Sequence, residues 1–155
     1  MQRKHYAKKR PTHNGSKLSF GIAVSRFNTD ITSSLLESAL KTLSESGVHK
    51  KNITILEVPG SFELPYACLM LSQKKPDAII ALGCIIKGET SHDQYIAHAT
   101  ATGLTEVSLK VGIPIIFGVL TTNNLKQAKV RSTGIMNKGK EAAETAIEMA
   151  SLNKT

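Results

Sequence analysis

The sequence predicts an α/β protein of three layers, in which a central four-stranded parallel sheet lies between two layers of helices. Two observations lead to this prediction. Short apolar segments alternate along the chain with longer segments whose apolar residues recur at helical spacing. One short segment, Ala78–Ile86, runs for nine residues without a charge, which is typical of a strand covered on both faces in a parallel sheet. A chain of 155 residues suits one domain with one core.

The four predicted strands are apolar segments that end at turn-forming or charged residues. Pro59 and Gly60 end the second of them, and Lys87 and Gly88 end the third. The strands are expected at residues 18–24, 52–58, 78–86 and 114–120. Because a helical segment separates each strand from the next, the crossovers should be right-handed and the layering flavodoxin-like.

Five segments are predicted to be helices. We expect Asp30 to cap the first helix, which ends at Gly47, and Ser61 to cap the second. Thr121 or Thr122 is expected to begin the short fourth helix, which Arg131 closes. The helices are expected at about residues 31–46, 62–72, 91–111, 122–131 and 136–152.

The net charge of +8 is concentrated at the start of the chain. Residues 1–17 contain six basic residues and no acid, which leaves 14 basic and 12 acidic residues for the rest. We interpret residues 1–17 as a basic, flexible arm and residues 18–155 as a single domain. The arm has one aromatic residue, so nucleic acid is not the favoured partner. A shell protein whose arm packages nucleic acid remains an alternative.

The two cysteines and the apolar runs indicate a cytoplasmic, soluble protein. Cys68 and Cys84 have neither CxxC spacing nor a secreted framework, and are interpreted as small core residues in a reducing compartment. The longest apolar runs are about half the length that is needed to span a bilayer.

The stretch ALGCIIKGETSHDQY, residues 81–95, is the strongest candidate for a functional site. A buried strand ends there, Gly88 turns the chain, and Thr90 or Ser91 can cap the helix that follows. The first N–H groups of that helix would form a cradle for an anion such as phosphate. His92 would lie beside the positive end of the helix dipole, which disfavours its charged form and suits a proton acceptor. The alternative is an ordinary strand, turn and capped helix.

Other segments also carry candidate residues. Phe27 follows the first strand, where parallel sheets place their ligands. Glu63 would accept hydrogen bonds from hydroxyls, or simply favour a helix N-terminus. Lys138 stands at a helix start that disfavours cations, a weak indication of a bound anion. His98 lies on another helix face than His92, so no metal site is predicted.

Five motifs in this order, SRFN, VPGSFELP, GCIIKGETSH, IIFGVLTTNN and RSTGIMNKGK, closely resemble the lumazine synthase family. The resemblance extends from about Leu18 to Leu152 and leaves out only the arm. It implies an enzyme of the penultimate step of riboflavin biosynthesis, which joins 5-amino-6-(D-ribitylamino)uracil to 3,4-dihydroxy-2-butanone 4-phosphate. The products would be 6,7-dimethyl-8-ribityllumazine, phosphate and water, and the family needs no metal or cofactor.

The resemblance also implies roles for individual residues. Phe27 would stack on the pyrimidine ring, and His92 would move protons. The remaining substrate-binding residues of the same chain would hold the ribityl group (Ser61, Phe62 and Glu63), the pyrimidine edge (Cys84, Ile85 and Ile86) and the phosphate (Gly88, Glu89 and Thr90). Lys87 is also expected among the substrate-binding residues.

In the family, a neighbouring subunit completes the site. Phe117, Arg131 and Lys138 would reach it from that subunit, with Arg131 clamping the phosphate as a catalytic residue. A homo-oligomer, at least a pentamer, is therefore expected, and riboflavin synthase is a candidate partner. Between Arg131 and Asn137 this chain has STGIM, a connection one residue shorter than the one that carries a GTKAG-like sequence in many shell-forming members, so the pentamer, the decamer and the sixty-subunit capsid all stay open. A flavin-binding carrier module is the non-enzymatic alternative.

Overall fold

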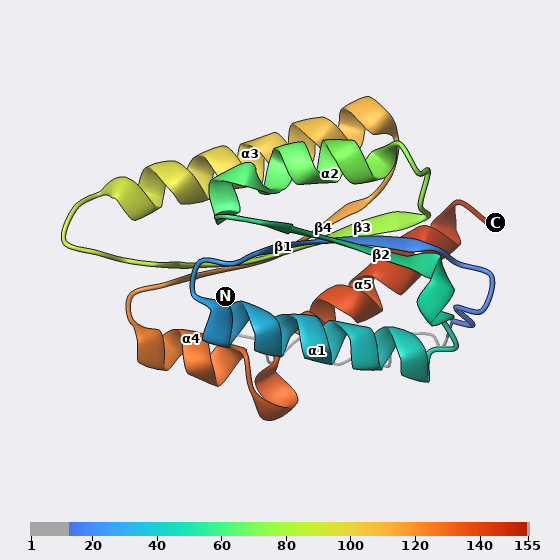
Figure 1. Ribbon diagram of the computed structural model, residues 1–155, viewed down its shortest axis with the longest axis horizontal. Coiled ribbons are helices and arrows are strands. Elements are labelled where there is room, and N and C mark those ends of the chain that lie inside the picture. Colours follow the sequence, from blue (N-terminus) through green and yellow to red (C-terminus); the bar gives the residue numbers. More distant parts are fainter. Residues whose placement is uncertain (1–12, 155) are drawn as a thin grey trace.

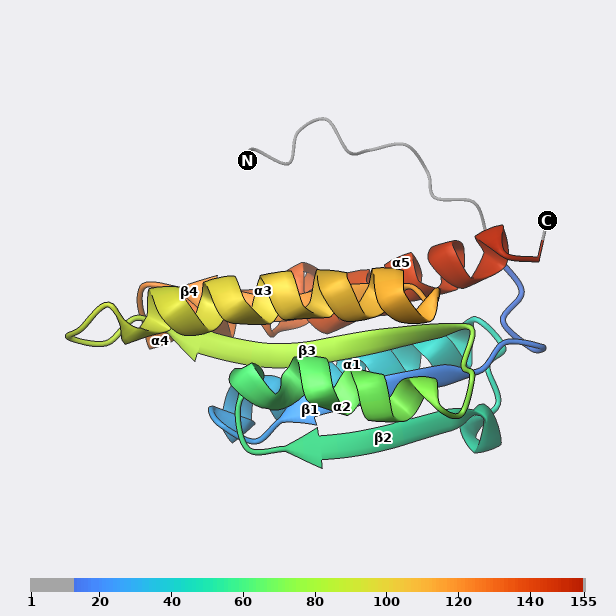
Figure 2. The same ribbon diagram turned by 90° about the horizontal axis from the view of Figure 1, so that it is seen from above.

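The sheet has four parallel strands and is the centre of a three-layer fold, as the sequence predicts. The computed structural model describes residues 13–154. Its strands lie in the order β2-β1-β3-β4, with β1 between β2 and β3 (Figure 2). Their bounds are β1 Phe20–Ser25, β2 Ile53–Val58, β3 Ala78–Ile86 and β4 Ile115–Thr122.

Helices cover both faces of this sheet (Figure 1). The first face carries α2 (Leu64–Ser72) and α3 (His92–Val111), and the second carries α1 (Thr29–Glu45), α4 (Leu125–Arg131) and α5 (Lys138–Leu152). Single turns of 3-10 helix, η2 (Lys50–Asn52), η3 (Ser61–Glu63) and η4 (Gly134–Met136), lie in the connections. Within residues 13–154, no helix is long and apolar enough to cross a membrane.

Two clusters of buried side chains hold the layers together. Phe20, Ile22 and Leu82 point to the α1 and α5 side, while Ala23 and Ile79 point to the α2 and α3 side. This alternation follows from the period of two along a strand. Both faces of β3 are buried over most of its length, which explains why its sequence carries no charge.

The ends of β3 agree with the prediction, and the other strands differ by one or two residues. The first strand begins at Phe20 instead of Leu18, and the fourth continues to Thr122. Thr121 and Thr122 therefore belong to β4, and the prediction that one of them begins α4 is wrong. The side chain of Asn124 caps α4 instead, accepting from the Gln127 N–H at 2.9 Å.

Two further predicted caps are wrong. The first helix begins at Thr29, so Asp30 lies in its first turn, and Asn28 occupies the cap position. Ser61 begins the η3 turn instead of capping a helix, and α2 begins only at Leu64. The Gly60 N–H there donates to Oε2 of Glu63 at 2.9 Å. In both loops another residue occupies the position before the helix, Asn28 for α1 and Glu63 for α2, and neither makes a side-chain capping bond.

The N-terminal segment can be followed only from His13, because residues 1–12 of the predicted basic arm lie outside the described part of the chain. The Gly15 N–H donates to the Ser46 carbonyl at 2.8 Å. Asn14 Oδ1 accepts from the Ser16 N–H at 2.9 Å, a side-chain bond typical of a turn. These bonds attach residues 14–16 to the C-terminal end of α1.

Candidate active site

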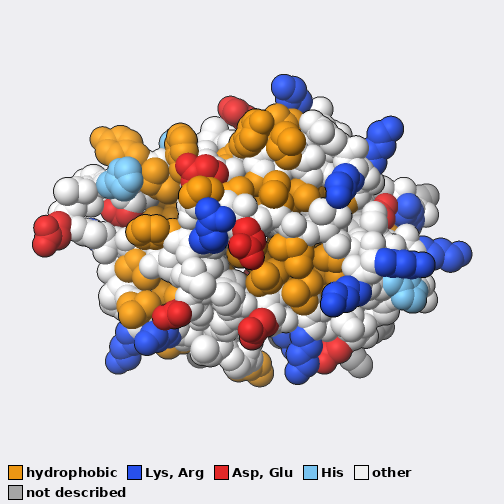
Figure 3. Space-filling model, in the orientation of Figure 1, with side chains coloured by type: hydrophobic (Ala, Val, Ile, Leu, Met, Phe, Trp, Pro, Cys, Tyr) orange, Lys and Arg blue, Asp and Glu red, His pale blue; other side chains and the backbone are white. Residues whose placement is uncertain are grey.

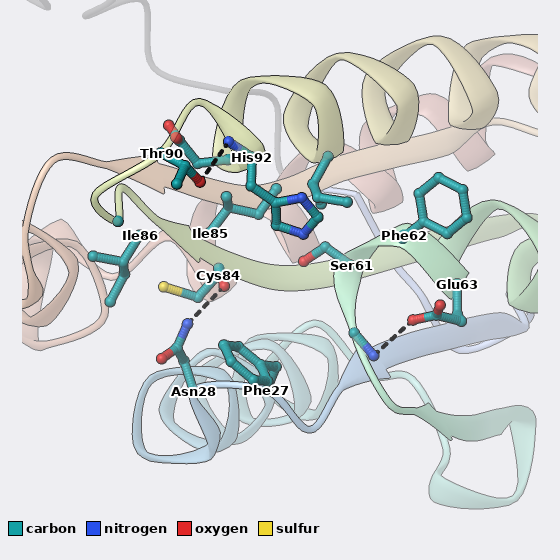
Figure 4. A pocket seen from close by; sticks show the side chains of 14 residues that line it. Phe27, Asn28, Ser61, Phe62, Glu63, Cys84, Ile85, Ile86, Thr90 and His92 are labelled. Atoms are coloured by element: carbon teal, nitrogen blue, oxygen red, sulfur yellow. Dashed lines mark hydrogen bonds between the residues drawn. The ribbon is translucent and has the colours of Figure 1, made fainter.

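A cavity of about 500 Å³ opens at the edge of the sheet where the strands end (Figure 4). It lies between the carboxyl ends of β1 and β3, where the connections leave for opposite faces of the sheet, the position at which open parallel sheets bind ligands. Fourteen residues line it: Phe27, Asn28, Gly60, Ser61, Phe62, Glu63, Cys84, Ile85, Ile86, Gly88, Thr90, His92, Asp93 and Ile96.

Most of the site residues predicted within one chain meet in this cavity. Phe27 comes from the loop after β1, residues 61–63 from η3, Cys84 from the end of β3, and His92 from the start of α3. Lys87 and Glu89 belong to the same turn as Gly88 and Thr90 but do not line the cavity. The fold therefore collects residues from four separate segments around one space.

The end of β3 exposes a backbone edge to the cavity. Pairing between β1 and β3 stops at Val24 and Leu82, whereas pairing between β3 and β4 continues to Ile86 and Thr122. The last residues of β3 therefore have a strand neighbour on one side only. On the other side the Cys84 carbonyl accepts from Asn28, and the remaining backbone groups of this edge are available to a ligand, as expected for a strand edge.

The turn from Lys87 to Ser91 leads into α3. Ser91 occupies the cap position without a side-chain hydrogen bond, and Thr90 Oγ1 accepts from the His92 N–H at 3.4 Å. A Cβ atom added to Gly88 would meet nothing within 4 Å, so the turn is open on its outer side. The first N–H groups of this 20-residue helix border the cavity and can attract an anion.

His92 is the first residue of α3, and its imidazole projects into the cavity (Figure 4). The side chain is exposed and no hydrogen bond within residues 13–154 holds the ring. The ring is therefore free to exchange protons with a bound molecule. Asp93, which follows it, also lines the cavity, and its Oδ1 is buried with no hydrogen-bond partner within the described chain.

Cys84 contributes backbone rather than reactive sulfur to the site. Burial raises the pKa of the Cys84 thiol to about 11 and that of Cys68 in α2 to about 12. Both thiols stay protonated near neutral pH and both are buried, so the prediction of small core residues is confirmed.

Four lining residues are not among the site residues that the sequence predicts: Asn28, Gly60, Asp93 and Ile96. Ile96 was detectable because it lies one helical turn after His92 and shares its face. Asn28 lies three residues after β1 and Gly60 two residues after β2, and only the tertiary structure shows that these two loops converge.

Comparison with known proteins identifies the family of this chain. The family model described as 6,7-dimethyl-8-ribityllumazine synthase matches residues 17–154. The chain belongs to this family. It is 45% identical over 142 residues to the 6,7-dimethyl-8-ribityllumazine synthase of Porphyromonas gingivalis, covering 90% of this chain and 88% of the relative.

Two further lumazine synthases have similar identity. That of Phocaeicola vulgatus is 44% identical over 138 residues, which is 88% of this chain and 82% of the relative. That of Parabacteroides distasonis is 43% identical over 142 residues, or 90% and 89%. The predicted family is confirmed, and with it an enzyme of riboflavin biosynthesis.

Three residues that the lumazine synthase resemblance places in the site lie away from this cavity. Phe117 on β4 and Lys138 on α5 line a second hollow. Arg131, at the end of α4, is exposed, and its Nη1 donates to the Gln127 carbonyl at 3.1 Å. One chain does not bring them to His92.

The charge environment of Lys138 has a local explanation. Its Nζ lies 3.1 Å from Oε2 of Glu141, one turn further along α5. This pair reduces the cost of a cation at a helix start, so the position of Lys138 is not by itself evidence of a bound anion.

Residues 13–154 contain no group of three or more His, Cys, Asp or Glu side chains that could hold a metal ion.

Proposed function

We propose that the cavity condenses 5-amino-6-(D-ribitylamino)uracil with 3,4-dihydroxy-2-butanone 4-phosphate, releasing phosphate and water, without a metal or cofactor and in the cytoplasm. One observation carries the proposal. His92 opens into the same cavity as an exposed aromatic ring, a carboxylate and the N-terminus of a long helix. The aromatic ring suits a flat substrate ring, the carboxylate suits a polyol chain, and the helix N-terminus suits a phosphate.

The pyrimidine would lie against Phe27, whose side chain is 71% exposed although it is aromatic. A flat ring placed on it would cover apolar area on both partners. The exposed backbone edge of residues 84–86 would read the donors and acceptors of the ring. Glu63 binds the Gly60 N–H through Oε2, and its carboxylate would accept hydrogen bonds from the ribityl hydroxyls beside Ser61 and Phe62.

The phosphate would lie at the start of α3. Gly88, Glu89 and Thr90 would surround it with backbone N–H groups, and the helix dipole favours a negative charge there. Lys87, exposed in the same turn, adds a positive charge. In this arrangement the reactive carbons of the butanone would lie near His92, between the phosphate and the pyrimidine.

The reaction requires that the two substrates be oriented toward each other and that protons be transferred. An amine of the pyrimidine attacks the ketone and loses water to give an imine. Phosphate is then eliminated together with a proton from the neighbouring carbon, and the resulting enol becomes a carbonyl. The second amine attacks this carbonyl and closes the ring with loss of a second water. His92 would accept and return protons in these steps. Holding two substrates in one cavity turns an encounter in solution into a reaction between neighbours.

A neighbouring copy would supply Phe117, Arg131 and Lys138. The assembly would be a pentamer or a multiple of one, as the family resemblance implies, and riboflavin synthase is a further candidate partner. Arg131 is exposed and carries no carboxylate partner among the ion pairs of the described residues. Its guanidinium can bind a phosphate through two parallel hydrogen bonds. Hydrophobic side chains gather on one face of the molecule (Figure 3). The exposed apolar side chains include Ile55 on β2 and Tyr66 and Met70 on α2, and such side chains suit a contact between copies.

Formation of the lumazine, followed by absorbance and fluorescence with both substrates and no added metal, is the direct test of the function. Arg131→Ala should raise the KM for the phosphate substrate about tenfold or more, because a charged hydrogen bond to phosphate is lost. The KM for the pyrimidine should change little. A correctly assembled wild-type protein that binds flavin but forms no product would instead identify a carrier.

Mixing two impaired variants, assayed below the KM of the phosphate substrate, tests whether the sites are shared. His92→Ala and Arg131→Ala proteins are dissociated, combined in equal amounts and reassembled. If each site takes His92 from one copy and Arg131 from its neighbour, roughly a quarter of the sites become intact and activity returns. Light scattering checks that the mixture has the mass of the wild-type assembly. A stable monomer, or no recovery in a correct assembly, would contradict shared sites.

A further inference from the structure

One side chain connects the loop after β1 to the end of β3. Asn28 follows Phe27, and its Nδ2 donates to the Cys84 carbonyl at 2.9 Å across the floor of the cavity (Figure 4). Asn28 itself lines the cavity. The bond therefore joins the residue next to the exposed aromatic ring to the strand edge that faces it.

The backbone of Asn28 has a conformation that few residues other than glycine adopt. Its φ of 60° and ψ of 49° lie in the left-handed region, which asparagine tolerates better than most residues. Lys75 is the other non-glycine residue with positive φ within residues 13–154. The Asn28 carbonyl begins α1 by accepting from the Ile31 and Thr32 N–H groups at 2.9 and 3.1 Å.

The side chain of Asn28 is not used in the usual way for its position. An asparagine before a helix normally caps it by accepting from a backbone N–H in the first turn. Here the side chain makes no such bond, and the amide is directed to β3 instead. Because β1 and β3 stop pairing at Val24 and Leu82, Asn28 bridges the two strands beyond their last backbone pair.

We infer that Asn28 is a positioning residue: it holds the Phe27 ring at a set distance from the end of β3 and so determines the width of the slot that takes the pyrimidine. The inference rests on the proposed function, in which the ring lies between Phe27 and the backbone of residues 84–86. The phosphate end of the cavity, at the start of α3, does not depend on this bond.

Two substitutions separate the hydrogen bond from the backbone conformation. Asn28→Gly keeps the left-handed conformation without strain but removes the donor. Asn28→Asp keeps the shape but places a carboxylate oxygen opposite the Cys84 carbonyl oxygen. We expect Asn28→Gly to raise the Kd and KM for the pyrimidine about three- to tenfold, the effect of one neutral hydrogen bond. Asn28→Asp should raise both further, and the KM for the phosphate substrate should stay unchanged in both variants.

Calorimetric titration with the pyrimidine alone gives the Kd, and steady-state kinetics give the two KM values. Lys75→Gly is the matched control, because it makes the same backbone change in the turn before β3, away from the cavity. It should leave all three values unchanged. Thermal unfolding of every variant shows how much stability each change costs.

The possible outcomes are distinct. A selective rise for the pyrimidine supports the inference. Equal rises for both substrates, or a lower melting temperature with unchanged KM values, would show a structural role only and overturn it. If both Asn28 variants had the same Kd and KM values as an active wild type, the inference would be overturned and the proposed function would stay intact. A wild type that binds no pyrimidine would overturn both.

Discussion

Replacing His92 with alanine is expected to lower kcat by about 10²- to 10⁴-fold, the usual contribution of a general acid–base group. Turnover should be slowed and not abolished, because orientation of the two substrates remains. The fold should be unaffected. The imidazole is exposed at the start of α3, and no hydrogen bond within residues 13–154 depends on the ring.

His98→Ala is the matched control for this experiment. His98 is an exposed histidine on the same helix, but it lines a different hollow from His92. Initial rates of lumazine formation with both substrates saturating measure kcat for the two variants. His98→Ala should behave like wild type. If His92→Ala kept full activity, the proton-transfer role would be disproved. A complete loss with substrate binding intact would mean that His92 does more than transfer protons.

Replacing Gly139 with alanine is expected to lower the free energy of unfolding by about 3 kcal/mol or more, at the upper end of overpacking effects. A Cβ atom at Gly139 would lie 2.0 Å from the backbone oxygen of Leu35 and 2.7 Å from its carbonyl carbon. The obstacle is backbone of α1, so no side-chain rotation relieves it. The two helices would have to separate, and contacts of Leu35 and Ala143 in the core would be lost.

Gly88→Ala provides the control for stability. A Cβ atom there meets nothing within 4 Å, and its φ lies outside the left-handed region. Chemical denaturation of both variants and the wild type gives the comparison, and Gly88→Ala should unfold within about 0.5 kcal/mol of wild type. Equal stability of Gly139→Ala and wild type would show that α1 and α5 pack less closely than the structure has them.

Both ends of β3 were predictable because a strand that is buried on both faces has a continuous apolar sequence. The strand must be apolar throughout, and charged or turn-forming residues stand on each side of it: Asp77 before, Lys87 and Gly88 after. The alternation of such segments with amphipathic helices leads to the parallel sheet without further information.

The helix caps were less predictable, because capping depends on a contact between a side chain and a backbone group, and the residue type alone does not determine that contact. Asp30 and Ser61 have suitable side chains, yet neither caps a helix. Asn28 occupies a cap position but donates its amide to Cys84 in another strand. Which backbone group a short polar side chain meets depends on the path of the loop, and the tertiary structure determines that path.

The sequence alone determined which kinds of side chain are available for the site, the strand–turn–helix unit that leads to His92, and the family to which the chain belongs. The tertiary structure decided which of these residues meet. Phe27, Glu63 and His92 converge because the order of strands in the sheet, rather than their order in the chain, places loops side by side. The same geometry keeps Phe117 and Lys138 outside that cavity, at the β4 edge of the sheet.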